Sequence, residues 1–162
     1  MPTLDITKDL DGCTMTVETG FDRPIERVWQ LWADPRQLER WWGPPTYPAT
    51  VTDHDLSVGG RVVYFMTGPE GDRHGGGWRV TAVEAPRLLE VVDFFLREDG
   101  EENTDLPSTT MSVRLSERAD GGTSVVIVSG FPSREAMEQL ISMGLEEGLA
   151  AAMGQMDAVL AD

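Results

Sequence analysis

Residues 22–45 read DRPIERVWQLWADPRQLERWWGPP, and the spacing of their apolar side chains decides how the chain on either side is interpreted. Apolar side chains recur at helical spacing in two runs, from Ile25 to Trp32 and from Leu38 to Trp42. Each run follows an aspartate that can cap a helix and a proline that suits its first turn, and Gly43 with the two prolines after it ends the second run. The stretch therefore predicts two short amphipathic helices in direct succession.

The segments on both sides of this stretch have the period-two pattern of β-strands. Before it, strand-like runs at 4–10 and 15–21 are joined by Asp11-Gly12, a dipeptide that suits tight hairpin turns. After it, candidate strands fall at 49–56, 60–67, 76–84, 88–97, 108–116 and 123–130. Gly59-Gly60 and Gly75-Gly76-Gly77 lack the setting of a phosphate-binding loop and are interpreted as turns or bulges. Short connections favour antiparallel neighbours, so about eight antiparallel strands are expected.

A long helix is expected to complete the chain. Ser133 can cap it, Glu135 lies in its first turn, and apolar residues then recur at helical spacing as far as Leu160. Three glycines fall inside this pattern, at positions 144, 148 and 154. Each costs a helix about 1 kcal/mol relative to alanine, so they predict a bend or a close approach of the helix to the sheet.

The composition is that of one water-soluble globular domain covering residues 1–162. Of these residues 40% are hydrophobic and 25% are charged, and no apolar run is long enough to span a bilayer. The N-terminus has neither the basic start nor the apolar stretch of a secretory signal, so a cytoplasmic location is expected. The net charge of −15 opposes binding to nucleic acid and to anionic membrane surfaces. The single cysteine, Cys13, excludes an internal disulfide and is interpreted as a packing residue.

A more specific set of motifs resembles a known superfamily. The residues that carry the resemblance are Pro24, Val28-Trp29, Asp34-Pro35, Leu38, Trp41-Trp42-Gly43-Pro44, Val58-Gly59-Gly60, Gly68-Pro69 and Gly71. With the order of elements, this series is similar to the START-like, or SRPBCC, superfamily, and within it to the AHSA-type branch, named after the activator of the heat-shock-protein-90 ATPase. The resemblance implies an α+β helix-grip fold, in which a curved antiparallel sheet of about six to eight strands wraps on a long C-terminal helix, with two short helices after the second strand. It also implies an apolar pocket between the sheet and that helix.

Strand alternation and helical spacing give the candidate lining of this pocket. The candidates are Val62, Tyr64, Met66, Trp78, Val91, Asp93, Phe95, Met111 and Val113 on the strands and Leu140, Met143, Leu149, Met153 and Met156 on the helix. Aromatic rings and flexible methionines suit a small hydrophobic or aromatic molecule. The alternative is that these residues fill the core, as any sheet-and-helix interior requires. Trp41 and Trp42 are expected to cover the end of the sheet rather than to stack on a ligand.

No residues form a recognisable reaction centre, so no catalytic residue is assigned. Asp93 is a weak candidate, because a carboxylate within an apolar strand needs a partner and could act as an acid or base, or orient a ligand hydroxyl. The alternative is that Asp93 faces solvent or pairs with Arg79 or Arg114. Tyr64 and His54 are the other weak candidates for moving a proton. Two histidines and one cysteine are too few for an ordinary metal site, and no cofactor is expected.

Three functions are compatible with these observations. The first is a pocket protein that binds a small hydrophobic or aromatic molecule, and it is favoured over catalysis because no reaction centre is present. The second, implied by the resemblance, is an enzyme similar to polyketide cyclases and dehydratases, in which a pocket carboxylate or tyrosine moves a proton. The third is a co-chaperone-type module that binds another protein. A homodimer is also compatible with the sequence, because a chain with five tryptophans could leave an apolar patch to cover.

Overall fold

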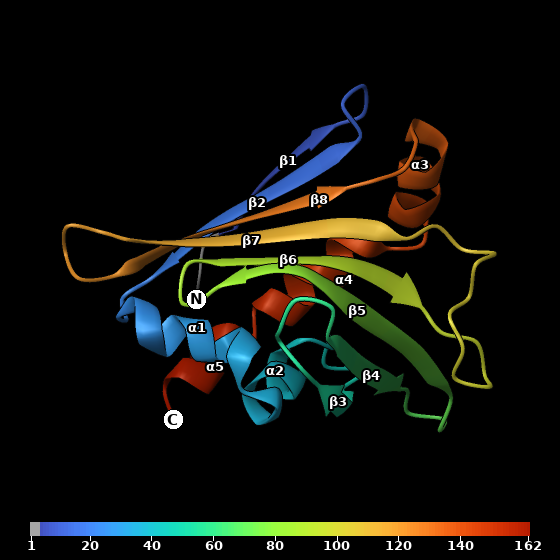
Figure 1. The fold of residues 1–162 in the computed structure, drawn as a ribbon, viewed down its shortest axis with the longest axis horizontal. Coiled ribbons are helices and arrows are strands. Elements are labelled where there is room, and N and C mark those ends of the chain that lie inside the picture. Colours follow the sequence, from blue (N-terminus) through green and yellow to red (C-terminus); the bar gives the residue numbers. More distant parts are fainter. Residues whose placement is uncertain (1–3) are drawn as a thin grey trace.

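The computed structural model describes residues 4–162, in which one curved antiparallel sheet wraps on the C-terminal helices (Figure 1). Its strands are β1 (Asp5–Asp9), β2 (Thr14–Phe21), β3 (Ala49–His54), β4 (Arg61–Thr67), β5 (Arg73–Glu84), β6 (Leu88–Phe95), β7 (Thr109–Glu117) and β8 (Thr123–Gly130). Its helices are α1 (Ile25–Ala33), α2 (Pro35–Trp41), α3 (Arg134–Ser142), α4 (Leu145–Met153) and α5 (Met156–Leu160). In this described range, no helix combines the length and the apolar character needed to cross a membrane. The predicted α+β helix-grip class is confirmed.

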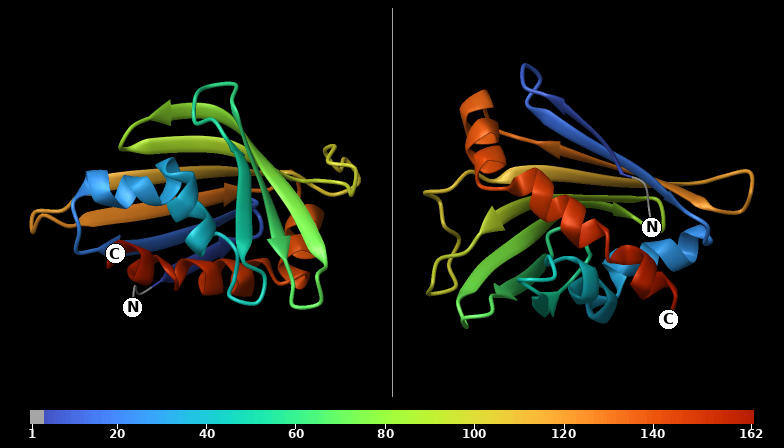
Figure 2. Two further views of the ribbon diagram at one scale, coloured as in Figure 1. Left: turned by 90° about the horizontal axis from the view of Figure 1, so that it is seen from below. Right: turned by 180° about the vertical axis from the view of Figure 1, so that it is seen from behind.

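The strand order explains where the two short helices lie. Across the sheet the order is β1-β2-β8-β7-β6-β5-β4-β3, with every neighbouring pair antiparallel. The chain must therefore pass from β2, near one edge, to β3 at the opposite edge, and α1 and α2 make this crossing (Figure 2). Asp34 starts α2, because its carboxylate accepts a hydrogen bond from the backbone N–H of Arg36 at 2.9 Å.

The core lies between the concave face of the sheet and the helices. β8 shows the alternation clearly, since Val125 and Ile127 are buried in the core and the residues between and beside them are partly exposed. All five tryptophans are buried, and the indole N–H of Trp41 donates to the carbonyl oxygen of Leu31 at 2.8 Å. The tryptophans leave no patch on the surface, so the reason for expecting a homodimer is wrong, and the homodimer itself stays a prediction.

The three consecutive glycines, Gly75 to Gly77, lie within β5 and pair with β4, which corrects their interpretation as a turn or bulge. A Cβ on Gly76 would lie 2.5 Å from the hydroxyl oxygen of Tyr64. A Cβ on Gly77 would lie 2.8 Å from the ring of Phe94. The absent side chains leave room for aromatic rings of both neighbouring strands to lie across β5.

The C-terminal segment forms three consecutive helices instead of the continuous helix that its apolar pattern predicts. α3 ends at Ser142, and Gly144 follows with a φ of +94°, a left-handed conformation that glycine adopts without strain. The chain changes direction there, so that α3 stands at the end of the sheet while α4 and α5 cross its concave side (Figure 2). Gly154 marks the second break, between α4 and α5. The predicted bend thus occurs at these two glycines, whereas Gly148 lies inside α4.

Candidate functional site

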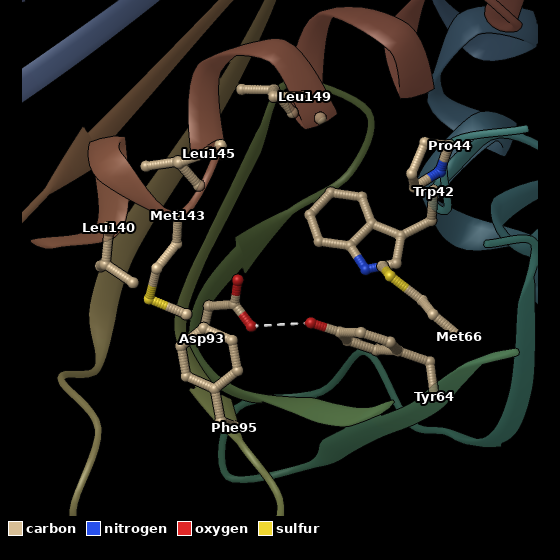
Figure 3. Close-up of a pocket in the computed structure, with 12 residues that line it drawn as sticks. Trp42, Pro44, Tyr64, Met66, Asp93, Phe95, Leu140, Met143, Leu145 and Leu149 are labelled. Atoms are coloured by element: carbon tan, nitrogen blue, oxygen red, sulfur yellow. Dashed lines mark hydrogen bonds between the residues drawn. The ribbon is translucent and has the colours of Figure 1, made fainter. Parts of the chain in front are cut away.

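A cavity of about 290 Å³ lies between the sheet and the junction of α3 with α4 (Figure 3). Its lining comes from β4 (Tyr64, Met66), from β6 (Asp93, Phe95), from the turn after α2 (Trp42, Pro44) and from the α3–α4 segment (Leu140, Met143, Gly144, Leu145, Gly148, Leu149). A second cavity of about 70 Å³ shares Trp42, Asp93 and Phe95 with it and therefore lies beside it. The side chains lining the larger cavity are apolar except for the carboxyl group of Asp93, the hydroxyl of Tyr64 and the indole nitrogen of Trp42.

Asp93 and Tyr64 form the polar centre of this cavity. The Tyr64 hydroxyl donates a hydrogen bond to Oδ1 of Asp93 at 2.9 Å, although β5 separates the strands that carry them. Tyr64 pairs directly with Gly76 on β5, and the missing side chain there leaves the space through which the phenol crosses this strand. Gly76 therefore positions the tyrosine on the carboxyl group.

Burial raises the pKa of Asp93 from its usual value of 3.8 to about 7. Hydrogen bonds from the Tyr64 hydroxyl and from the backbone N–H of Phe94 favour the carboxylate and limit this rise. Asp93 keeps some accessible surface and lines both cavities. The pKa of Tyr64 is raised well above 10, first by burial and then by the adjacent carboxylate. At neutral pH the cavity therefore holds a neutral tyrosine beside a carboxyl group that populates both protonation states.

Neither of the arginines proposed as partners of Asp93 reaches it. The guanidinium group of Arg79 lies 3.6 Å from Glu102, and that of Arg114 lies 3.8 Å from Glu90. Both arginines are exposed on the outside of the sheet. The expectation that Asp93 faces solvent or pairs with an arginine is therefore wrong, and the carboxyl group is buried with a tyrosine as its hydrogen-bonding side chain.

Trp42 closes the cavity immediately after the end of α2. Its ring packs edge-on against Tyr64 and Trp78, with centroid separations of 5.7 and 4.9 Å. The Trp42 side chain is only 9% exposed, and among the described residues its indole N–H approaches the Tyr64 hydroxyl without forming a well-aligned hydrogen bond. Figure 3 shows the nitrogen-bearing edge of this indole turned toward the tyrosine hydroxyl and the carboxyl group. Gln155 holds the turn that carries Trp42, since its side-chain amide donates to the carbonyl oxygen of Gly43 at 2.7 Å.

Half of the predicted pocket residues line the larger cavity. These are Tyr64, Met66, Asp93, Phe95, Leu140, Met143 and Leu149. Met111 lines the smaller cavity. The other predicted residues, Val62, Trp78, Val91, Val113, Met153 and Met156, are buried in the core and line neither cavity, so the alternative of core filling holds for them. Strand alternation identifies the whole inner face of the sheet, and the cavity occupies only part of that face.

Five lining residues were not predicted. They are Trp42, Pro44, Gly144, Leu145 and Gly148. Both tryptophans were expected to cover the end of the sheet. Trp41 is buried in the core and Trp42 lines the cavity, and helical spacing gave no means of separating two adjacent tryptophans. The break at Gly144 sets the orientation of α4, so Leu145 could be placed only by treating that glycine as a helix end.

His54 does not belong to the cavity. It ends β3, and its Nε2 lies 2.9 Å from the carbonyl oxygen of Trp32, to which it donates a hydrogen bond. Cys13 is partly buried against an apolar cluster that includes Met15 and Phe131. Over residues 4–162, no three His, Cys, Asp or Glu side chains are grouped so that they could hold a metal ion.

A curved sheet wrapped on C-terminal helices around an apolar cavity defines a START-like, helix-grip protein. The chain belongs to the family described as Activator of Hsp90 ATPase homolog 1-like protein, which matches residues 22–161. The resemblance indicated by the motifs between Pro24 and Gly71 is thereby confirmed. No curated protein matches the chain.

Solved structures of bacterial proteins share the fold over nearly the whole chain. Protein Ms6760 from Mycobacterium smegmatis is 48% identical, with a TM-score of 0.89 over 99% of this chain and 97% of that one. A protein from Arthrobacter aurescens is 44% identical, with a TM-score of 0.92 over 97% of this chain and 91% of that one. CalU16 from Micromonospora echinospora is 18% identical, with a TM-score of 0.60 over 99% of this chain and 86% of that one. At that identity the likeness to CalU16 concerns the fold alone.

Proposed function

We propose that this protein binds a small, largely apolar molecule in the cavity between the sheet and the α3–α4 junction. The observation that carries the proposal is an apolar cavity of about 290 Å³ whose lining includes one buried carboxyl group and its tyrosine partner. Protein interiors are packed nearly as densely as organic crystals, so an apolar space of this size loses contacts that a ligand would restore. Its size and its few convergent polar groups are those of small-molecule sites.

The rim of the cavity supports the same conclusion. Met143 lines the cavity beside Gly144 and is 57% exposed, which is unusual for a large apolar side chain. A ligand in the cavity would cover part of this surface and gain hydrophobic stabilisation from it. The unbranched methionine also adapts to ligands of different shape.

Gly148 allows a direct test. It lines the cavity, and a Cβ at this position would meet no atom within 4 Å. Gly148→Leu therefore adds a side chain to the lining of the cavity without a clash at its Cβ, and this side chain should take up space that a ligand needs. Removing a glycine from the middle of α4 also favours the helix. Ala151→Leu, at an exposed position of the same helix, is the matched control.

The measurement is thermal denaturation in the presence of a panel of aromatic and aliphatic small molecules. Ligands that bind the folded state raise Tm by mass action. We expect such increases for the wild type and for Ala151→Leu, and their loss in Gly148→Leu. Equal increases in all three proteins, or no increase in the wild type with any compound, would contradict the proposal.

A second candidate function is proton-transfer catalysis in the same cavity, by an enzyme similar to polyketide cyclases and dehydratases. It is favoured by one observation, the pKa of about 7 for Asp93, which lets this group accept or release a proton near neutral pH. Asp93→Asn separates the two functions. An enzyme loses turnover of a bound compound in this variant, whereas a binding protein returns the compound unchanged from both the wild type and the variant. Binding to another protein, as in a co-chaperone, stays a prediction.

A further inference from the structure

We propose that the ligand carries a hydroxyl group at its buried end, which donates a hydrogen bond to the carboxylate of Asp93 and accepts one from the indole N–H of Trp42. This inference rests on the proposed function and adds the chemical class of the ligand, an alcohol or phenol with an apolar body. It follows from the hydrogen-bonding groups that the cavity leaves without partners.

The first unpartnered group is a donor. Trp42 is nine-tenths buried, and its indole N–H approaches the Tyr64 hydroxyl but forms no well-aligned hydrogen bond with any acceptor among residues 4–162. Buried donors without partners are uncommon, because each one forfeits its hydrogen bond to water. The nitrogen-bearing edge faces the polar centre of the cavity (Figure 3), so an acceptor on a bound molecule would satisfy it.

The second group is an acceptor. One oxygen of Asp93 accepts a hydrogen bond from Tyr64, and the backbone N–H of Phe94 also favours the ionised form. A carboxylate has about four lone-pair positions, so these donors leave acceptor capacity free. The candidate arginines pair elsewhere, as described above, so the bound molecule must bring the remaining donor.

A hydroxyl group is the smallest group that both donates and accepts. A hydrocarbon would leave the indole N–H of Trp42 and the remaining acceptor positions of Asp93 without partners in a cavity from which it had displaced water. A carboxylate would lie beside the carboxylate of Asp93 and be repelled by it. An ammonium group would donate to Asp93 but meet the N–H edge of Trp42, which is the positive edge of the ring, and a ketone would accept from Trp42 but give Asp93 no donor.

Four probes with the same naphthalene body separate these cases. 2-Naphthalenemethanol carries the hydroxyl group, and 2-ethylnaphthalene, 2-naphthylmethylammonium and 2-acetylnaphthalene replace it by a methyl group, a cation and an acceptor-only carbonyl group. Equilibrium dialysis against wild-type protein at pH 8, above the pKa of about 7 of Asp93 so that its carboxylate predominates, gives the four dissociation constants. We expect the alcohol to bind at least about fivefold more tightly than each of the others, from one net hydrogen bond or more.

Two variants test the assigned partners. Asp93→Asn keeps an acceptor for the Tyr64 hydroxyl and turns an amide donor toward the ligand, so the preference should shift from the alcohol to the ketone. Trp42→Phe should reduce the advantage of the alcohol over 2-ethylnaphthalene. Trp32→Phe is its control, because the Trp32 indole is fully buried, has an N–H without a partner among residues 4–162 and packs against Trp41, outside the cavity.

The outcomes distinguish this inference from the proposed function. If 2-ethylnaphthalene binds as tightly as the alcohol, or if the ammonium or the ketone binds most tightly to the wild type, the hydroxyl inference is overturned while binding in the cavity stands. If none of the four probes binds to the wild type, the proposed function and the inference fail together. The predicted order, with its reversal toward the ketone in Asp93→Asn, supports both.

Discussion

Replacing Asp93 by asparagine should remove a specific pH dependence of stability. Asparagine keeps an oxygen that accepts from the Tyr64 hydroxyl but cannot ionise. In the wild type, the pKa of Asp93 is about 7 in the folded protein and near 3.8 in the unfolded chain. Between these values the folded state holds a proton that the unfolded state has released. The free energy of unfolding of the wild type therefore falls as pH rises through this window, and the loss is complete above it.

The magnitude follows from the separation of about 3 pH units between the two pKa values. At about 1.4 kcal/mol per unit, the complete loss amounts to about 4 kcal/mol. Between pH 5 and pH 8, where chemical unfolding is practical, it amounts to about 2 to 3 kcal/mol. For a chain of 162 residues this corresponds to a change of about 5 to 10 °C in Tm.

Urea unfolding of both proteins at pH 5, 6, 7 and 8 measures this effect as a difference in free energy. Groups that titrate alike in both proteins cancel from the difference. Glu101→Gln, in the exposed loop after β6, reports the effect of losing one negative charge alone. The advantage of Asp93→Asn should grow by about 2 to 3 kcal/mol from pH 5 to pH 8. An advantage that does not change with pH would refute the burial of this carboxyl group, on which the site depends.

Three further variants test how the site is built. Gly76→Ala should lower the free energy of unfolding by about 1 to 3 kcal/mol, because its Cβ would lie 2.5 Å from the Tyr64 hydroxyl oxygen. Chemical denaturation measures this loss, and unchanged stability would count against the crossing of β5 by the phenol. Tyr64→Phe should raise the pKa of Asp93 above about 7, since it removes a donor to the carboxylate. Carbon-13 NMR titration of the carboxyl carbon measures this pKa, and a value lower than that of the wild type would contradict the assigned hydrogen bond. Gln155→Ala should lower Tm by about 2 to 6 °C and weaken ligand binding, because the carbonyl oxygen of Gly43 loses its donor; calorimetry showing no change in either would exclude this role.

Much of the fold is predictable because its signals are local. The strand expected at 123–130 is β8, Thr123–Gly130, since alternation along one strand needs no knowledge of its neighbours. The cap and proline at Asp34-Pro35 likewise place the start of α2. The glycines in the C-terminal pattern indicated a bend, but separate helices are visible only once the φ of Gly144 is known.

The site is less predictable because its contacts are not local. Asp93 was singled out as a carboxyl group in an apolar strand, but its partner Tyr64 lies 29 residues earlier in the chain and two strands away in the sheet. The contact depends on Gly76, because a side chain at this position would clash with Tyr64. Sequence spacing cannot show which aromatic ring occupies the space beside a glycine. The position of Trp42 in the cavity was not predicted for a related reason, since the direction of its side chain depends on the turn that Gln155 holds through the carbonyl oxygen of Gly43.

The central claim is that the cavity is a binding site for a small molecule, and native mass spectrometry of the protein purified from the organism that produces it tests this claim most directly. The account predicts a stoichiometric small molecule that travels with the protein, has a largely apolar body and is released on denaturation. Extraction and identification of that molecule would also reveal whether it carries a hydroxyl group. A protein that is empty as purified, and whose Tm is unchanged across a broad panel of aromatic and aliphatic ligands, would contradict the account.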